Sequence, residues 1–164
     1  MICLKELSLN DGGEVYAMLQ EIAADDNGFH NKVCGMSYDQ FREWLAAEYA
    51  IDHGLLEEWM VPQTSYWLYD GDRPVGYGRM RHDLNPKLSE TGGHIGYAIR
   101  NTERGKGYGH AILSLLLDEC KKRHLEVVQI GVREDNAASN RVVIRHGGKL
   151  VRTCNHKNIY HIYL

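Results

Sequence analysis

The segment RGKGYG, residues 104–109, combines three glycines with two basic residues directly before a leucine-rich stretch. A glycine inside a helix costs about 1 kcal/mol relative to alanine, so a helix start gains no stability from three of them. Small residues do let a ligand approach the backbone, and the free N–H groups and dipole of a helix N-terminus favour an anion. Arg104 and Lys106 add positive charge to the same turn. The segment therefore predicts a phosphate-binding loop rather than a plain tight turn.

Two common phosphate-binding loops do not match this segment. The chain contains no GxxxxGK string followed by Ser or Thr, which a Walker A loop requires. A dinucleotide-binding fingerprint requires GxGxxG after the first strand of a sheet, whereas the glycines here stand at 105, 107 and 109 and follow several expected strands. A nucleotide-binding protein is therefore the weakest hypothesis for this loop.

Hydrophobic periodicity indicates the elements that must hold the loop in place. A strand is expected over residues 92–100, directly before the loop, and a leucine-rich helix directly after it. Asp70-Gly71-Asp72 between two aromatic-rich runs predicts a β-hairpin over residues 64–82. The other expected elements are a strand at 1–9, helices at 13–24 and 37–54, a loop at 27–36, a strand at 126–132, a short helix ending at 146, and closing strands at 149–155 and 158–164. This order predicts a single domain, residues 1–164, of mixed α/β class.

Composition and residue spacing bound the class of protein. The 164 residues are 43% hydrophobic and 25% charged, as is ordinary for a globular domain. No apolar run approaches the ~20 residues of a membrane span, and the first residues lack the regions of a signal peptide, so we expect a cytoplasmic protein without a membrane partner. The four cysteines and nine histidines show no metal-ligand spacing, so unpaired cysteines and no metal are expected.

Two segments together resemble a known family. RGKGYG matches the R/Q-x-x-G-x-G/A signature of the GNAT superfamily of acyl-CoA N-acyltransferases, and DNAASNRVVIRHGGKL, residues 135–150, resembles that family's second segment. The resemblance covers residues 64–164 and looks like a bacterial branch of predicted acetyltransferases. It implies a central, mostly antiparallel, twisted sheet of about seven strands, splayed at the fourth strand, with about four helices packed on both faces.

The resemblance also implies acetyl-CoA as a co-substrate. The backbone of residues 104–109 would bind its pyrophosphate, and the backbone of Ala98 and Ile99 its pantetheine arm. Asn136 would contact the cofactor where the later helix begins, and it is also a favoured helix cap. The implied cofactor-binding residues are Ala98, Ile99, Arg104, Gly105, Lys106, Gly107, Tyr108, Gly109, Asn136 and Ser139.

The sequence departs from the family pattern at Val143. Many GNAT enzymes place a tyrosine there, seven residues after the Asn, as the acid that protonates the departing thiolate. Tyr97, Tyr108, Tyr160 or a water molecule remain the alternatives for this acid. The valine also keeps open a second class of function, a non-catalytic sensor module that binds acyl-CoA.

An amine that attacks a thioester must lose a proton, so a base is expected near the strand that precedes the loop. His94, Gly96 and Ala98 alternate onto one face of that strand unless a bulge intervenes. His94 is favoured because an ordinary histidine pKa of about 6.5 suits proton abstraction near neutral pH, whereas Glu90 would need burial to raise its pKa. The other candidates are His82 and Asp83.

The leading hypothesis is therefore an N-acetyltransferase that moves an acetyl group from acetyl-CoA directly to a primary amine. Residues 1–70 hold 13 acidic and 3 basic side chains, whereas residues 71–164 hold 9 acidic and 16 basic ones. If the basic half holds phosphates, the acidic half would attract a small or cationic acceptor, either a small molecule or a peptide amine. No nucleic-acid partner is expected, and a homodimer is left open.

Overall fold

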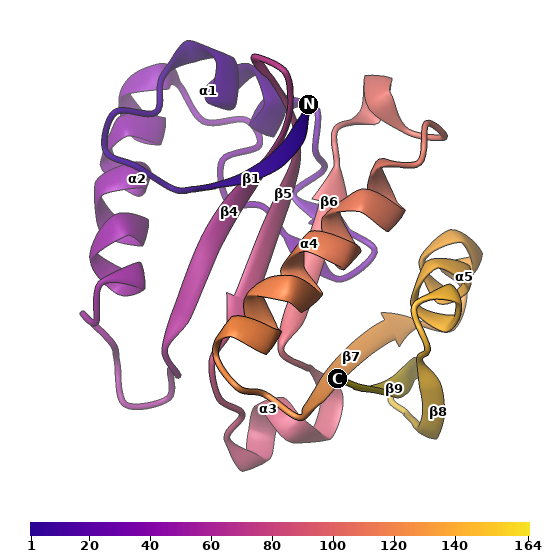
Figure 1. The fold of residues 1–164 in the computed structure, drawn as a ribbon. Coiled ribbons are helices and arrows are strands. Elements are labelled where there is room, and N and C mark those ends of the chain that lie inside the picture. The colour runs from indigo at the N-terminus through magenta and orange to yellow at the C-terminus, as the bar shows by residue number, and fades with distance from the viewer.

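Two antiparallel sheets form the centre of the protein in a computed structural model that describes all of residues 1–164 (Figure 1). The elements are, in order, β1 (Ile2–Glu6), α1 (Gly13–Gln20), β2 (Asp25–Asp26), β3 (Phe29–His30), α2 (Tyr38–Asp52), β4 (Gln63–Asp70), β5 (Arg73–Arg81), α3 (Pro86–Thr91), β6 (Ile95–Ile99), the short 3-10 helix η1 (Asn101–Glu103), α4 (Tyr108–Lys122), β7 (Val127–Arg133), α5 (Ala137–Arg145), β8 (Lys149–Cys154) and β9 (Lys157–Tyr163). The expected mixed α/β class is confirmed, although the structure has nine strands and five α-helices.

The larger sheet has the strand order β1-β4-β5-β6, and every neighbouring pair in it is antiparallel. β4 and β5 form the expected hairpin, which turns at Gly71 with a φ of 60° in the left-handed region. The smaller sheet has the order β7-β9-β8 and is also antiparallel. The remaining strands, β2 and β3, pair only with each other.

The two sheets touch at one end of β6 and then separate. The His94 N–H, just before β6, donates to the Gln129 carbonyl of β7 at 2.8 Å. Beyond this contact no ladder joins the two strands, and Figure 1 shows their arrows diverging. β6 is the fourth strand in the order β1-β4-β5-β6, so the splay lies at the strand that the family resemblance implied.

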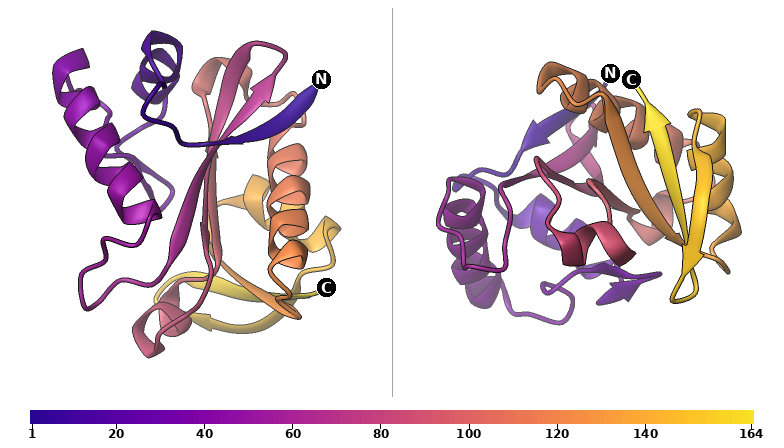
Figure 2. Two further views of the ribbon diagram at one scale, coloured as in Figure 1. Left: turned by 60° about the vertical axis from the view of Figure 1, so that its left-hand side comes forward. Right: turned by 90° about the horizontal axis from the view of Figure 1, so that it is seen from below.

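Helices cover both faces of the larger sheet (Figure 2). α4 packs on one face through a cluster of 16 buried residues that includes Leu113 and Leu116. α1 and α2 pack on the other face through a cluster of 13 buried residues that includes Phe41 and Trp67. β6 serves both clusters, because Ile95 belongs to the first and Ala98 to the second. None of the helices is both long and apolar enough to cross a membrane.

Two short elements differ from the sequence-based expectation. Residues 27–36 were expected as a loop, but Asn27 and Gly28 form the turn of the β2–β3 hairpin, with φ values of 51° and 93°. The helix α3 was not expected at all. It begins at Pro86 after Asn85, whose side chain accepts a hydrogen bond from the Leu88 N–H at 2.9 Å. Both elements border the cavities described next.

Candidate active site

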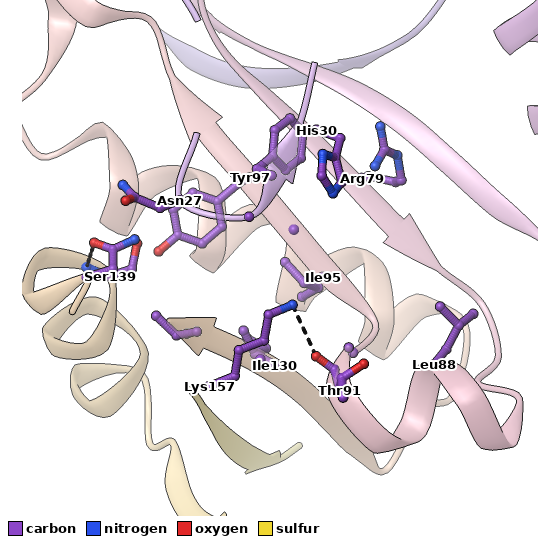
Figure 3. A pocket seen from close by; sticks show the side chains of 18 of the residues that line it. Asn27, His30, Arg79, Leu88, Thr91, Ile95, Tyr97, Ile130, Ser139 and Lys157 are labelled. Atoms are coloured by element: carbon purple, nitrogen blue, oxygen red, sulfur yellow. Dashed lines mark hydrogen bonds between the residues drawn. The ribbon is translucent and has the colours of Figure 1, made fainter. Parts of the chain in front are cut away.

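Three adjoining cavities follow the splayed strand. The loop cavity, of about 370 Å³, lies between residues 104–109 and the start of α5. The central cavity, of about 300 Å³, lies between β6, β7 and the β2–β3 hairpin (Figure 3). The aromatic cavity, of about 280 Å³, lies between α2 and β5 and is lined by Trp44, Trp59 and Tyr77.

The three cavities share walls, so they form one continuous space. This space runs from the α4 and α5 side of β6 to the α2 side. Tyr97, Asn136 and Ser139 line both the loop cavity and the central cavity. Arg79 and Arg81 line both the central cavity and the aromatic cavity. These shared walls connect the loop cavity through the central cavity to the aromatic cavity.

The glycine loop presents backbone rather than side chains to the loop cavity. Gly105 and Gly107 have φ values of 77° and 88°, and Gly107 precedes α4 without any side-chain cap. The first backbone hydrogen bond of the helix is donated by the Ala111 N–H to the Gly107 carbonyl. The N–H groups just before residue 111 therefore stay free, which is the arrangement that binds a phosphate.

The charged side chains of the loop are turned toward neighbouring carboxylates. Arg104 donates to Asp26 of β2 at 2.8 Å, and Lys106 donates to Glu103 at 2.8 Å. The Tyr108 hydroxyl donates to Asp70 at 2.6 Å. The loop is thus anchored by its side chains, and its backbone remains available to a ligand.

Asn136 and Ser139 begin α5 at the wall between the loop and central cavities. The Asn136 side chain accepts a hydrogen bond from the Ser139 N–H at 3.2 Å, so it caps the helix as expected. Both residues also line the two cavities, so the cap position and a ligand-contacting position coincide. Val143, one turn further along, is fully buried in the core.

Of the three tyrosines considered for the acid, Tyr97 is the one whose hydroxyl forms no hydrogen bond. Its ring lies beside Asn27 with the hydroxyl directed toward Ser139 (Figure 3), and this hydroxyl is buried without forming a hydrogen bond. Burial raises the pKa of Tyr97 above its ordinary value, and the neighbouring Ser139 opposes that rise. The other two tyrosines considered for the acid are occupied, since Tyr108 donates to Asp70 and Tyr160 donates to Asn140 at 2.6 Å.

His94 does not reach any of the three cavities. Its Nδ1 accepts a hydrogen bond from the Gln129 N–H at 2.9 Å, so the ring joins β6 to β7 at the base of the splay. Burial is the main cause that lowers the pKa of His94. The alternation expected along β6 holds without a bulge, but the position before β6 turns its side chain toward β7.

The other candidate bases also lie outside the cavities. Glu90 is exposed on α3, where its carbonyl accepts a hydrogen bond from Arg152. His82 shares a hydrogen bond of 2.8 Å with the Thr64 hydroxyl, and Asp83 is exposed. None of these three side chains lines the loop, central or aromatic cavity.

Several cavity residues were missed by the sequence analysis. His30 of the β2–β3 hairpin lies beside Arg79 (Figure 3), and both line the central and aromatic cavities. Glu48 of α2 lines the aromatic cavity. Two sequence signals pointed to this region: Asn27-Gly28 is a common hairpin turn, and Arg79-Met80-Arg81 places two guanidinium groups on one face of a strand.

The comparisons with known proteins agree with this geometry. Residues 17–148 match the model of the acetyltransferase (GNAT) family. No curated protein matches the sequence closely enough to count as a relative. Among solved structures, the ribosomal L7/L12 alpha-N-protein acetyltransferase RimL in complex with coenzyme A is similar with a TM-score of 0.73 and 16% identity, over 99% of this chain and 94% of that chain.

Two further solved structures have the same fold. The Salmonella typhimurium acetyltransferase that modifies the N-terminal serine of ribosomal protein L7/L12 is similar with a TM-score of 0.70 and 15% identity, over 99% of this chain and 95% of that chain. The spermidine/spermine N-acetyltransferase SpeG from Vibrio cholerae is similar with a TM-score of 0.65 and 14% identity, over 100% and 94% of the two chains. At these identities the likeness concerns the fold.

Proposed function

Since the chain belongs to the GNAT family of acetyltransferases, we propose that it transfers an acetyl group from acetyl-CoA to a primary amine. The observation that carries this proposal is that the loop, central and aromatic cavities adjoin one another along the splayed strand β6. The N-terminus of α4, whose first N–H groups are free, lies at the end of the loop cavity. A thioester entering from the loop side and an amine entering from the aromatic side would meet in the central cavity. The residues that line each cavity come from both residues 1–70 and residues 71–164, so we also propose that residues 1–164 act as one domain.

The residues beside the loop cavity fit coenzyme A. The free N–H groups between residues 107 and 111 would bind the pyrophosphate, and the backbone at Ala98 and Ile99 lies along the path for the pantetheine arm. Asn136 and Ser139 stand where that arm would pass from the loop cavity into the central cavity. Acetyl-CoA supplies the activated acyl group, and no covalent intermediate with the protein is needed.

Tyr97 is the proposed general acid. Its hydroxyl is unpartnered and lies at the wall that the loop and central cavities share. A phenol with a raised pKa keeps its proton at neutral pH and can donate it to a thiolate as the thiolate departs. This role would replace the tyrosine that the family pattern places at Val143, a position that is buried in the core here.

His30 is the proposed base in place of His94. Its ring lies at the junction of the central and aromatic cavities, where an entering amine would pass. His94 keeps a structural role in this proposal, because its Nδ1 is already bonded to the backbone of β7. An imidazole nitrogen at this junction could accept the proton that the attacking amine loses.

The test combines binding with turnover. Calorimetric titration with acetyl-CoA measures binding, and release of the free coenzyme A thiol measures transfer to a panel of amines. Binding together with amine-dependent thiol release supports the enzyme. Tight binding without thiol release for any amine would instead support the non-catalytic sensor, and absence of binding would refute both.

A further inference from the structure

Two arginines on β5, Arg79 and Arg81, lie two positions apart and form no ion pair, although the carboxylates of Glu48 and Asp52 lie near enough to Arg79 to raise its pKa. Arg79 and Arg81 alternate along the strand, so their side chains leave the same face of the sheet. Neither forms a salt bridge, although eight other Lys or Arg side chains of the chain do. Arg79 donates only to the Tyr77 hydroxyl at 2.9 Å, and Arg81 only to the Gly93 carbonyl at 3.0 Å. Each guanidinium carries five N–H donors, so most of their donors are free.

The two guanidinium groups are partly removed from water. The Arg79 guanidinium lies 5.2 Å from the centre of the Phe29 ring and 5.4 Å from that of Tyr77. Burial, and the positive charge of Arg79, lower the pKa of Arg81 to about 10. Keeping two such charges together is costly unless a ligand of opposite charge joins them.

The rest of the central cavity is basic as well. Lys87 and Lys157 also line it, and Lys157 donates to the Thr91 carbonyl at 3.3 Å (Figure 3). The one carboxylate in its wall belongs to Asp26, which is already bonded to Arg104 at 2.8 Å. This cavity therefore repels a cation and attracts an anion.

The aromatic cavity offers a different surface on the other side of the arginines. Trp44, Ile51, Met60 and Val61 give it apolar walls. Its acidic group, Glu48, accepts a hydrogen bond from Gln63 at 3.0 Å. A ligand that fills this space beside Arg79 and Arg81 would combine an apolar body with an anionic group.

We propose that the acceptor amine carries a carboxylate, as an amino acid with an apolar side chain does, and that Arg79 and Arg81 bind this carboxylate. The inference rests on the acetyltransferase function proposed above and names its acceptor class. It replaces the cationic acceptor expected from the acidic first half of the sequence. A polyamine would bring ammonium groups next to two guanidinium groups that form no ion pair, whereas a carboxylate pairs with guanidinium in a bidentate arrangement.

Matched ligands test the anionic group directly. Calorimetry would compare L-leucine, its amide, 3-methylbutylamine, the aminophosphonate analogue of leucine, and spermidine, each with and without saturating coenzyme A. We expect leucine to bind about 10- to 100-fold more tightly than its amide, the factor expected for hydrogen bonds to a charged group. Preference for the aminophosphonate over leucine would keep the anionic class and replace the carboxylate by a phosphoryl group.

Variants of Arg79 and Arg81 test whether these two side chains cause the preference for leucine over its amide. Arg79→Gln and Arg81→Gln should each reduce the preference for leucine over its amide about tenfold or more, while the affinity for coenzyme A stays unchanged. Arg81→Lys, which keeps the charge but not the planar fork, should recover part of the preference. Arg145→Gln is the control, because Arg145 is exposed on α5 and lines none of the three cavities.

Three outcomes would overturn the inference: equal binding of leucine and its amide, a preference for spermidine, or an unchanged preference in both arginine variants that still bind coenzyme A. These outcomes are separate from failure of the proposed function, which would show as no binding of coenzyme A or as binding without thiol release for any amine. The titrations without coenzyme A still measure the acceptor preference in that case.

Discussion

Replacing Tyr97 by phenylalanine should change stability and activity in opposite directions. The Tyr97 hydroxyl is buried and has no hydrogen-bond partner in the free protein. A buried polar group left unsatisfied costs about 1–3 kcal/mol, so its removal should stabilise the free protein by at least about 1 kcal/mol. For a domain of this length, that gain raises Tm by about 2–4 °C.

The same change should slow the reaction. If the hydroxyl protonates the departing thiolate, its loss removes general acid catalysis, which contributes about 10²- to 10⁴-fold to the rate. We therefore expect kcat to fall by about 100-fold or more, with little change in the affinity for coenzyme A. The measurements are thermal unfolding, the thiol-release assay and calorimetric titration.

Tyr66 provides a matched control for this experiment. Its hydroxyl is also buried without a partner, but it belongs to the core cluster beneath α4 and lines none of the three cavities. Tyr66→Phe should raise Tm by a similar amount and leave kcat unchanged. An unchanged kcat in Tyr97→Phe, or an equal loss of kcat in Tyr66→Phe, would refute the assignment of Tyr97 as the acid.

Four further results are expected. Gly107→Leu should still fold, because nothing lies within 4 Å of an added Cβ, although the φ of 88° adds about 1–2 kcal/mol of strain. The leucine side chain would cover the free N–H groups at the start of α4, so calorimetry should show that binding of coenzyme A is lost. Leu113→Ala in the fully buried core should lower the free energy of unfolding in urea by about 2–5 kcal/mol. His30→Ala should lower kcat/KM in the thiol-release assay about 100-fold or more, whereas His94→Ala should lower it much less, and the reverse result would restore His94 as the base. The hydrogen bond from Arg100 lowers the pKa of Glu21, so the stability difference between the wild type and Glu21→Gln should be full above about pH 5 and disappear as the pH falls through that lowered pKa.

The sequence by itself determined the elements whose signals are local. The helix expected over residues 37–54 starts as predicted at Ser37, which caps α2, and the structure completes the capping box with Gln40. Asp70-Gly71-Asp72 predicted the β4–β5 hairpin through turn chemistry. Residues 104–109 predicted a glycine loop that runs directly into a helix, and in the structure Gly105 and Gly107 adopt positive φ values just before α4. Each of these signals depends on residues a few positions apart.

The tertiary structure alone decided which side chains share a cavity. His94 has the residue type and strand position expected of a base. Its Nδ1, however, accepts a hydrogen bond from the backbone N–H of Gln129, which lies 35 residues further along the chain. Arg79 and His30 lie far apart in the sequence and line the same two cavities, because the β2–β3 hairpin lies beside β5 and β6. Likewise, the hydroxyl of Tyr97 on β6 lies buried beside Ser139 of α5, 42 positions further along the chain, without forming a hydrogen bond to it. Such partners are chosen by packing between distant segments, for which periodicity and turn residues carry no information.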